Sequence, residues 1–487
     1  MRRDVPLFAA VVVIAVVISF FTGSTAARRT SAPAGTAAVT ARTLVCPAVN
    51  GLPRHTTATA VAADVGGTLS PVPSPAGAGT VTSSVLNGLK ASRSAAMHLG
   101  PTAEVHSTAL QSESVAITGN GSIAANLAAD ELSETVSGRY RALAGGNCLP
   151  PATDWWFAGG NGKLGFTDRL ILANPAGTDA DVGVTVWTPH GVTTPPRFAA
   201  IRVPAESRVS IGLLAVAPDI STLAMHVHAE SGAVVAAVVD RRTSGLDSDG
   251  GDLVPPTLPP SRHPVIAGFP AGTGTRTLVL ANPGTADASV SVKVVTAVGE
   301  FTPSSVKPVV VGPGRTSVVD LSNAFNGGGG AVLVNSDQPV LAEGRTILTP
   351  SGRRLRPDLS WAPAAHPLSG PAGVAIGHEP DGGVCVLVLS APAGAASVRV
   401  TTPSGGSQTI TVAAGHSESV DITSTVRSGT GEWPFLVTPV GSAPVYGARQ
   451  LYFSGAHGAL LTTEPLVGLP RPISLPTVRQ DPRIAVR

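Results

Sequence analysis

The residues of this chain best suited to chemistry are two histidines and a group of aspartates in its second quarter. His226 and His228 lie two positions apart in AMHVHAE, on one side of an expected strand, and such a pair can bind a metal ion. An exposed strand face is the favoured interpretation. Asp247, Asp249 and Asp252 in GLDSDGGDL offer several oxygens to calcium but lack the EF-hand spacing and its distal glutamate. We expect this segment to be a solvated loop.

Arginine recurs near the end of four segments, at intervals of about 103 residues. This spacing suggests a shared structural task, in which each guanidinium bonds to turn carbonyls or to a carboxylate such as Asp320 or Asp421. The functional alternative is a repeated contact with an anion or glycan, for which Arg345 is the candidate. The four residues are Arg139, Arg242, Arg345 and Arg449.

Tryptophan is concentrated in the same region of the chain. Trp155, Trp156 and Trp187 could form a sugar-binding face or a sandwich core, and the core is favoured. If this region binds a ligand, Trp155 and Trp156 are the expected contacts.

Motifs for common catalytic sites are missing from the sequence. There is no GxSxG nucleophile elbow, no HExxH zinc motif, no P-loop and no CxxC pair. We therefore predict no catalytic residue, no cofactor and no metal site, and we expect a protein that is not an enzyme. An enzyme built from residues distant in sequence stays open as a third possibility.

The composition favours short strands joined by many turns. The 487 residues are 43% hydrophobic, 13% charged and 4% aromatic, with 55 glycines and 43 prolines. A chain of this length predicts three or four domains. The formal net charge is +2, and no basic stripe is present, so nucleic acid is not an expected partner.

Internal repeats with a period of about 109 residues organise the chain. LILANP at 170–175 matches LVLANP at 278–283 and, less closely, LVLSAP at 387–392, and an alternating strand follows each. The first repeat lacks this motif. The expected segments are a signal or anchor at 1–29, a linker at 30–41, repeats at 42–150, 151–260, 261–368 and 369–470, and a C-terminal strand or tail at 471–487.

About seven short strands are expected in each repeat. That number, with turn signals between them, favours an all-β fold of tandem immunoglobulin-like β-sandwiches after the N-terminal hydrophobic helix. A β-propeller is the alternative, with nearly two four-stranded blades in each repeat.

The N-terminus predicts export. Arg2 and Arg3 precede a hydrophobic run at 7–21, which suits a signal peptide or, with its flanks, a retained membrane anchor. Either outcome places the remaining chain outside the cytoplasm, where disulfides persist. We expect Cys46 and Cys148, at the ends of the first repeat, to pair, and Cys385 to be a buried structural thiol.

The recurring pattern LxLxNP, an alternating strand, VPAxSxxxVDL and PVxAxR resembles that of bacterial surface proteins. Over residues 1–470 the chain resembles an actinobacterial family of secreted or membrane-anchored proteins of unknown function with tandem immunoglobulin-like repeats. The resemblance implies an envelope location and that fold, and it carries no catalytic residues.

The expected function is therefore a non-enzymatic cell-envelope scaffold or protein-binding protein displayed outside the membrane. The alternative is a cell-wall glycan-binding or adhesive protein. The expected partners are an envelope protein or wall polysaccharide, with the membrane reached through the N-terminal anchor; a secreted form is the alternative location.

Overall fold

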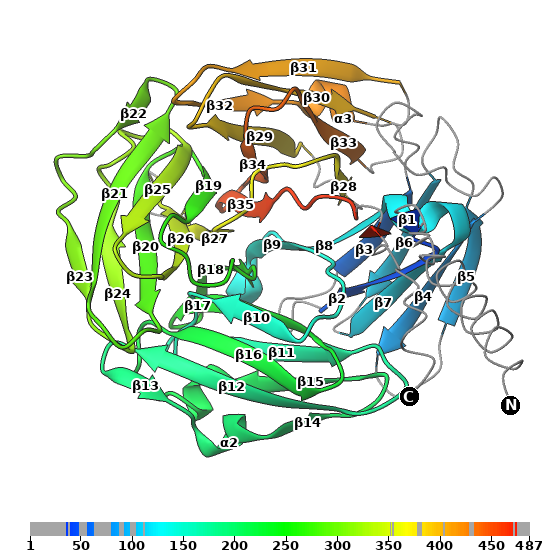
Figure 1. Ribbon diagram of the computed structural model, residues 1–487, viewed down its shortest axis with the longest axis horizontal. Coiled ribbons are helices and arrows are strands. Elements are labelled where there is room, and N and C mark those ends of the chain that lie inside the picture. Colours follow the sequence, from blue (N-terminus) through cyan, green and yellow to red (C-terminus); the bar gives the residue numbers. More distant parts are fainter. Residues whose placement is uncertain are drawn as a thin grey trace, which may run out of the picture. The chain divides into compact units, whose positions relative to one another are not determined.

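The computed structural model confirms an all-β chain (Figure 1). It describes residues 36–37, 39–47, 56–62, 79–86, 92–97, 104–110, 113–350, 352, 355–376, 382–402, 405–427, 433–470 and 473–474. The expected signal or anchor at 1–29 lies outside these residues. Two compact units are present, one of Met1–Ala38 with Pro472–Arg487 and one of Val39–Arg471. In the first, β1 (Thr36–Ala37) pairs antiparallel with β36 (Ile473–Ser474).

The larger unit contains four repeats with the same order of strands. Numbered along each repeat, the described strands occupy eight positions in two sheets, ordered 1-6-3-4 and 5-2-7-8. The first repeat has β2 (Ala41–Cys46), β3 (Thr56–Ala62), β4 (Gly79–Leu86), β5 (Ser92–Met97), β6 (Glu104–Leu110), β7 (Ser114–Asn120), β8 (Leu127–Thr135) and β9 (Ala142–Asn147). The fourth has β28 (Ala372–Ile376), β29 (Val384–Ala391), β30 (Ala396–Thr401), β31 (Ser407–Val412), β32 (His416–Asp421), β33 (Trp433–Val440), β34 (Tyr446–Gly455) and β35 (Gly458–Pro465).

The second and third repeats keep this order but divide position 4 into two short strands. The second has β10 (Asp154–Phe157), β11 (Arg169–Asn174), β12 (Ala180–Thr188), β13 (Gly191–Thr193), β14 (Ile201–Val203), β15 (Ser207–Gly212), β16 (Ala224–Ser231), β17 (Val235–Ser244) and β18 (Asp247–Val254). The third has β19 (Val265–Phe269), β20 (Gly274–Asn282), β21 (Ala288–Thr296), β22 (Gly299–Phe301), β23 (Val309–Val311), β24 (Arg315–Asp320), β25 (Gly330–Ser336), β26 (Leu341–Leu348) and β27 (Asp358–Pro363). One parallel residue pair, Thr188 on β12 with Arg315 on β24, joins a sheet of the second repeat to a sheet of the third.

The immunoglobulin-like assignment is not confirmed. An immunoglobulin domain pairs seven strands as ABED and CFG, whereas the described strands of each repeat follow the eight-position order above. Within the described residues the sheets also close into neither a barrel nor a propeller.

Alternation of side chains explains why the two sheets of a repeat pack together. In β21 the sequence ASVSVKVVT alternates buried and exposed side chains over its first six residues, so its valines enter the core. The fourth repeat has a core with buried side chains from both sheets, among them Leu387, Val398 and Trp433. Each such apolar face is covered by its partner sheet, which is the basis of a β-sandwich.

The shared Asn-Pro motif ends the second strand by a side-chain clamp. Asn282 donates from Nδ2 to the carbonyl oxygens of Ala286 at 2.7 Å and Val311 at 2.9 Å, while its Oδ1 accepts from the Gly284 amide at 3.0 Å. Asn174 makes the corresponding bonds in the second repeat. The motif thus fixes the turn and ties it to the strand at position 4.

The eighth strands of the four repeats meet one another. β9 contacts β18, β18 contacts β27, β27 contacts β35, and β35 contacts β9 (Figure 1). These strands contain the small and polar segments ALAGGN and DSDGGDLV, and Gly145 lies against Glu464 with no space for a Cβ atom. Glycine therefore permits the close approach. Residues 247–252, which were expected to form a loop, belong to β18.

Asp358 links its own repeat to the other three. Its Oδ2 accepts from the backbone amides of Leu143 in the first repeat at 3.3 Å and Leu461 in the fourth at 3.0 Å, and its Oδ1 accepts from Gly251 in the second at 3.3 Å. The side chain is buried, and burial raises the pKa of its carboxyl to about 7 against the lowering effects of the Leu461 amide, Arg141 and the Gly251 amide.

Arg141 of the first repeat makes a second link of this kind. Its guanidinium donates to the carbonyl oxygens of Pro357 at 3.1 Å and Ala459 at 2.7 Å, and the Ser248 hydroxyl donates to its backbone oxygen at 2.6 Å. Backbone carbonyl groups where the repeats meet thereby receive hydrogen bonds from side chains of other repeats.

A buried ion triad joins the first repeat to the fourth. Arg449 on β34 pairs with Asp130 on β8 and with Glu464 on β35, and all three side chains are almost completely buried. Asp130 also accepts from the Ala375 amide at 3.0 Å. Removing one partner of such a triad leaves a buried charge uncompensated, so the intact triad ties the first repeat to the fourth.

Candidate functional site

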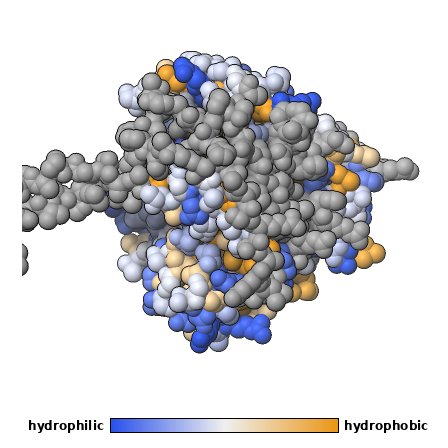
Figure 2. Space-filling view, turned by 90° about the vertical axis from the view of Figure 1, so that its right-hand side faces the viewer, coloured by the Kyte–Doolittle hydropathy of each residue, from blue (hydrophilic) through white to orange (hydrophobic). Residues whose placement is uncertain are grey.

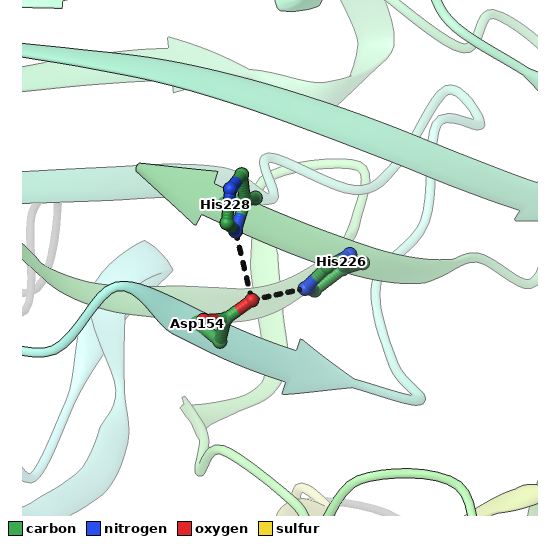
Figure 3. A group of neighbouring side chains, drawn as sticks. All are labelled: Asp154, His226 and His228. Atoms are coloured by element: carbon green, nitrogen blue, oxygen red, sulfur yellow. Dashed lines mark hydrogen bonds and ion pairs between the residues drawn. The ribbon is translucent and has the colours of Figure 1, made fainter. Parts of the chain in front are cut away.

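A cluster of side chains of types that can bind a metal ion lies on the sheet of the second repeat that contains β10, β16 and β12. β10 is the edge strand, and it pairs with β16 so that Asp154 is opposite His228 and Trp156 is opposite His226. One oxygen, Asp154 Oδ1, lies 2.9 Å from His226 Nε2 and 2.8 Å from His228 Nδ1 (Figure 3). The three ligand atoms all lie within 4.8 Å of one another. We call these three residues the Asp-His cluster.

Neighbouring side chains orient the Asp-His cluster. The Thr153 hydroxyl donates to the other carboxylate oxygen, Asp154 Oδ2, at 2.8 Å. The Trp156 ring stacks on His226, with centroids 3.7 Å apart and planes 7° apart, and Trp156 also stacks on Trp187 at 5.9 Å. The carboxylate and one imidazole are therefore each held in place by a neighbouring side chain.

The electrostatics of the Asp-His cluster favour an ionised carboxylate. Hydrogen bonds, first from His228 and then from Thr153, lower the pKa of Asp154 to about 2. Partial burial lowers the pKa of His226, although the Asp154 carboxylate opposes this effect. At neutral pH the site thus presents a carboxylate beside a neutral imidazole.

Part of this arrangement was predicted from the sequence. His226 and His228 were expected on one strand face, and they lie on β16 with side chains 22% and 46% exposed. Asp154 was missed because it lies 72 residues before His226, and only the pairing of β10 with β16 brings it close. The nearby dipeptide WW after Asp154 was the one available signal.

The two candidate tryptophans have different surroundings. Trp155 points into the core, is 8% exposed and donates from Nε1 to the Val234 carbonyl at 2.8 Å. Trp156 is half-buried at the Asp-His cluster, and His226 occupies one face of its ring. Alternation along β10 therefore separates the pair, and of the two only Trp156 lies beside an exposed polar cluster.

The four recurrent arginines do not occupy equivalent positions. The motif leucines Leu170, Leu278 and Leu387 pair with Val238, Gly344 and Arg449, so Arg242 and Arg345 lie beyond the position of Arg449 in their repeats. The suggested carboxylates are also engaged elsewhere: Asp320 with Ser322 and Asp421 with Thr423. Equal spacing here conceals different strand registers, because the repeats differ in loop length.

Arg345 is half-buried beside Trp361 and Asp240. Its guanidinium lies 5.5 Å from the centre of the Trp361 ring, and burial lowers its pKa against the opposing effect of Asp240. Asp240 accepts from Trp361 Nε1 at 2.9 Å. The environment is that of a buried polar cluster with a cation–π contact.

The remaining predicted residues are placed as follows. Cys46 and Cys148 form a disulfide across a sequence separation of 102 residues, and Cys385 is a buried free thiol whose pKa burial raises to about 12. Asp252 is completely buried in β18, where it accepts from Gly145 N at 3.2 Å and from the Thr462 hydroxyl at 3.1 Å. The aspartate segment is therefore part of the junction between repeats, which corrects its assignment to a solvated loop.

A basic groove of about 460 Å³ lies elsewhere on the second repeat. Three arginines line it, Arg169, Arg197 and Arg202, with Arg197 on the short helix α2 (Pro196–Ala199). Arg169 is anchored by a bond from Nε to the Ser210 hydroxyl at 2.8 Å, and Arg202 pairs with Asp179. The groove could accept an anion.

The fold and its surface clusters define an all-β repeat protein, and comparison with known proteins gives its family. The chain belongs to a family of unknown function, DUF5719, whose model matches residues 102–423, more than half of the chain. No curated protein matches it. Within the described residues, no helix has the length and apolar character needed to cross a membrane.

Proposed function

We propose that the protein is a non-enzymatic scaffold or protein-binding protein of an actinobacterial cell envelope, displayed outside the membrane. The N-terminal hydrophobic segment would anchor it as a single-pass protein, and cleavage there would give a secreted form. One observation carries the scaffold role: a single carboxylate, Asp358, bonds to backbone amides of all three other repeats. A body fixed in this way can hold its surfaces at constant separations.

Two features support a location outside the cytoplasm. The basic residues and apolar run at the N-terminus suit export, and the Cys46–Cys148 disulfide suits an oxidising compartment. The exposed large hydrophobic residues include Leu164 and Val298. On the face in Figure 2, hydrophobic and hydrophilic residues are interspersed where they are coloured. Such a surface is compatible with water on the described face.

Location is tested with cells that express the full chain with a C-terminal epitope tag. Protease added to intact cells is expected to remove the tag, whereas a chain starting at residue 30 should keep it. Protection of the full chain would contradict display outside the membrane.

The scaffold role is tested by sedimenting the full chain with membranes from its own cells or with isolated wall polymer. Saturable capture by membranes, with one envelope protein recovered by crosslinking at stoichiometric yield, is the expected result. Capture by neither material would contradict the proposal.

A second candidate function is binding to an anionic cell-wall glycan, favoured by the basic groove. Arg197 is exposed and Arg202 is largely exposed, so they could contact phosphate or carboxylate groups. Saturable wall binding that weakens in Arg197→Ala but not in the matched control Arg399→Ala would support this function. Arg399 is exposed on β30, far along the chain from the groove.

A further inference from the structure

We propose that the Asp-His cluster binds a divalent transition-metal ion of the zinc class. The ligands would be Asp154 Oδ1, His226 Nε2 and His228 Nδ1. Two imidazole nitrogens and one carboxylate oxygen form a ligand set that zinc, nickel and cobalt accept, whereas calcium and magnesium prefer oxygen alone. This inference is independent of the scaffold function.

Two of the three distances between the ligand atoms suit such an ion after a small adjustment, and the third, between the two imidazole nitrogens, is within 4.8 Å. Zinc binds nitrogen and oxygen at about 2.0–2.1 Å, so tetrahedral ligands are separated by roughly 3.3–3.4 Å. Asp154 Oδ1 lies 2.9 Å from His226 Nε2 and 2.8 Å from His228 Nδ1, so each gap must open by about half an ångström. The Asp154 side chain is 46% exposed, and its carboxylate has room to move outward.

The strand pairing explains why the ligands meet. His226 and His228 are at i and i+2 on β16 and share a face, and Asp154 is the direct cross-strand partner of His228. Cross-strand neighbours have Cβ atoms about 5 Å apart, a separation that two short ligand side chains can bridge with a metal between them. The backbone hydrogen bonds of β10 and β16 therefore fix the site before any ion arrives.

Second contacts restrict the ligands further. The Thr153 hydroxyl bonds to Asp154 Oδ2 and leaves Oδ1 to face the histidines, and the Trp156 ring holds the His226 imidazole parallel to itself. Outer contacts of this kind orient ligands at known metal sites. Because β10 is an edge strand and the cluster is solvent-accessible, a fourth coordination position is open to water or to a ligand group from another molecule.

A simple polar cluster would have the same hydrogen bonds without an ion. In that case both histidines donate hydrogen bonds to Asp154 Oδ1, and an added metal ion does not displace the protons of these bonds. The two possibilities differ in their response to added metal and in which substitutions abolish it.

The test uses the full chain, purified without a polyhistidine tag and stripped with a chelator. Equilibrium dialysis against Zn²⁺ is expected to give one ion per chain, and Co²⁺ should give visible absorption bands of a low-coordinate nitrogen–oxygen site. Asp154→Asn and His228→Gln should each raise the Zn²⁺ dissociation constant by at least about ten-fold. Both side chains are 46% exposed, so the variants are expected to fold.

His190→Gln is the matched control, since His190 is exposed in the same repeat and lies outside the Asp-His cluster. It should bind Zn²⁺ as tightly as the unaltered chain, and circular dichroism should show the same spectrum for all four proteins. Zn²⁺ binding that is absent, or equally tight in Asp154→Asn and His228→Gln, would overturn the proposal.

Discussion

At the scale of single residues, the carboxyl group of Asp358 makes the stability of the contacts between repeats depend on pH. Burial raises its pKa to about 7, whereas an aspartate in the unfolded chain titrates near pH 4. Between these values the folded protein retains a proton that the unfolded chain has released. The contribution of Asp358 to stability is therefore complete below about pH 4 and is lost as the pH rises through about 7. Glu464, whose pKa burial raises to about 8, acts in the same direction.

We predict that Asp358→Asn flattens the pH dependence of stability. The free energy of unfolding of the unaltered chain should fall, relative to that of the variant, by on the order of 4 kcal/mol between pH 4 and pH 8. Denaturant unfolding at several pH values measures this. The amide loses one acceptor for the backbone groups of Leu143 and Leu461, so the variant should be less stable at pH 4. Asp287→Asn, at an exposed position, is the control and should keep the original slope; an unchanged slope in Asp358→Asn would refute the coupling.

Sequence reasoning at this scale succeeded where chemistry is local. The spacing of His226 and His228 was enough to place both on one strand face. Asp154 and Asp358 gain their significance from partners in other strands or repeats, which lie far from them in the sequence. The regular spacing of the arginines was misleading, because residues at equal intervals in the sequence occupy different positions along the paired strands of the repeats.

At the scale of elements, alternating apolar strands and the Asn-Pro turn were predictable, and the eighth strands were not. Strands such as β12 and β21 bury one face against a partner sheet, so their sequence shows a period of two. β9 and β18 contact other repeats and are buried almost throughout, which removes that period and admits glycine and aspartate. The seven expected strands were therefore one short of the eight positions in the described repeats.

The turn after the second strand provides the element-scale prediction. Asn282→Ala should destabilise the protein by about 2–3 kcal/mol, because the buried carbonyl of Val311 and the Gly284 amide lose their partner. Asn282→Ser should cost less, because the serine hydroxyl keeps one hydrogen-bonding group at this turn. Chemical denaturation measures both variants.

The control for this turn is Asn335→Ala, because Asn335 is exposed on β25. It should change stability by no more than about 0.5 kcal/mol. If Asn282→Ala had an effect as small as this, the side-chain clamp would not be what holds the turn.

At the scale of the whole larger unit, the repeats contact one another across the unit in addition to following one another along the chain. The first and fourth meet through the Asp130–Arg449–Glu464 triad and through the bond from Asn147 Nδ2 to the Pro465 carbonyl at 2.9 Å. Neighbouring repeats share further bonds, such as that from the Ser417 hydroxyl to the Val295 carbonyl at 2.9 Å. A tandem array of independent sandwiches, as expected from the sequence, would lack the contact between the first repeat and the last.

These contacts predict that the four repeats unfold together. In calorimetry at pH 5 with the disulfide intact, the calorimetric enthalpy should be about equal to the van't Hoff enthalpy, whereas four independent repeats would give a ratio near 4. A chain ending at residue 368 should lose cooperative unfolding altogether, because Arg141 and Asp358 then lose the fourth-repeat partners Ala459 and Leu461. A ratio near 4 in the full chain, or a stable three-repeat chain with its original melting temperature, would mean that each repeat carries its own stability and that the buried polar junction only positions them.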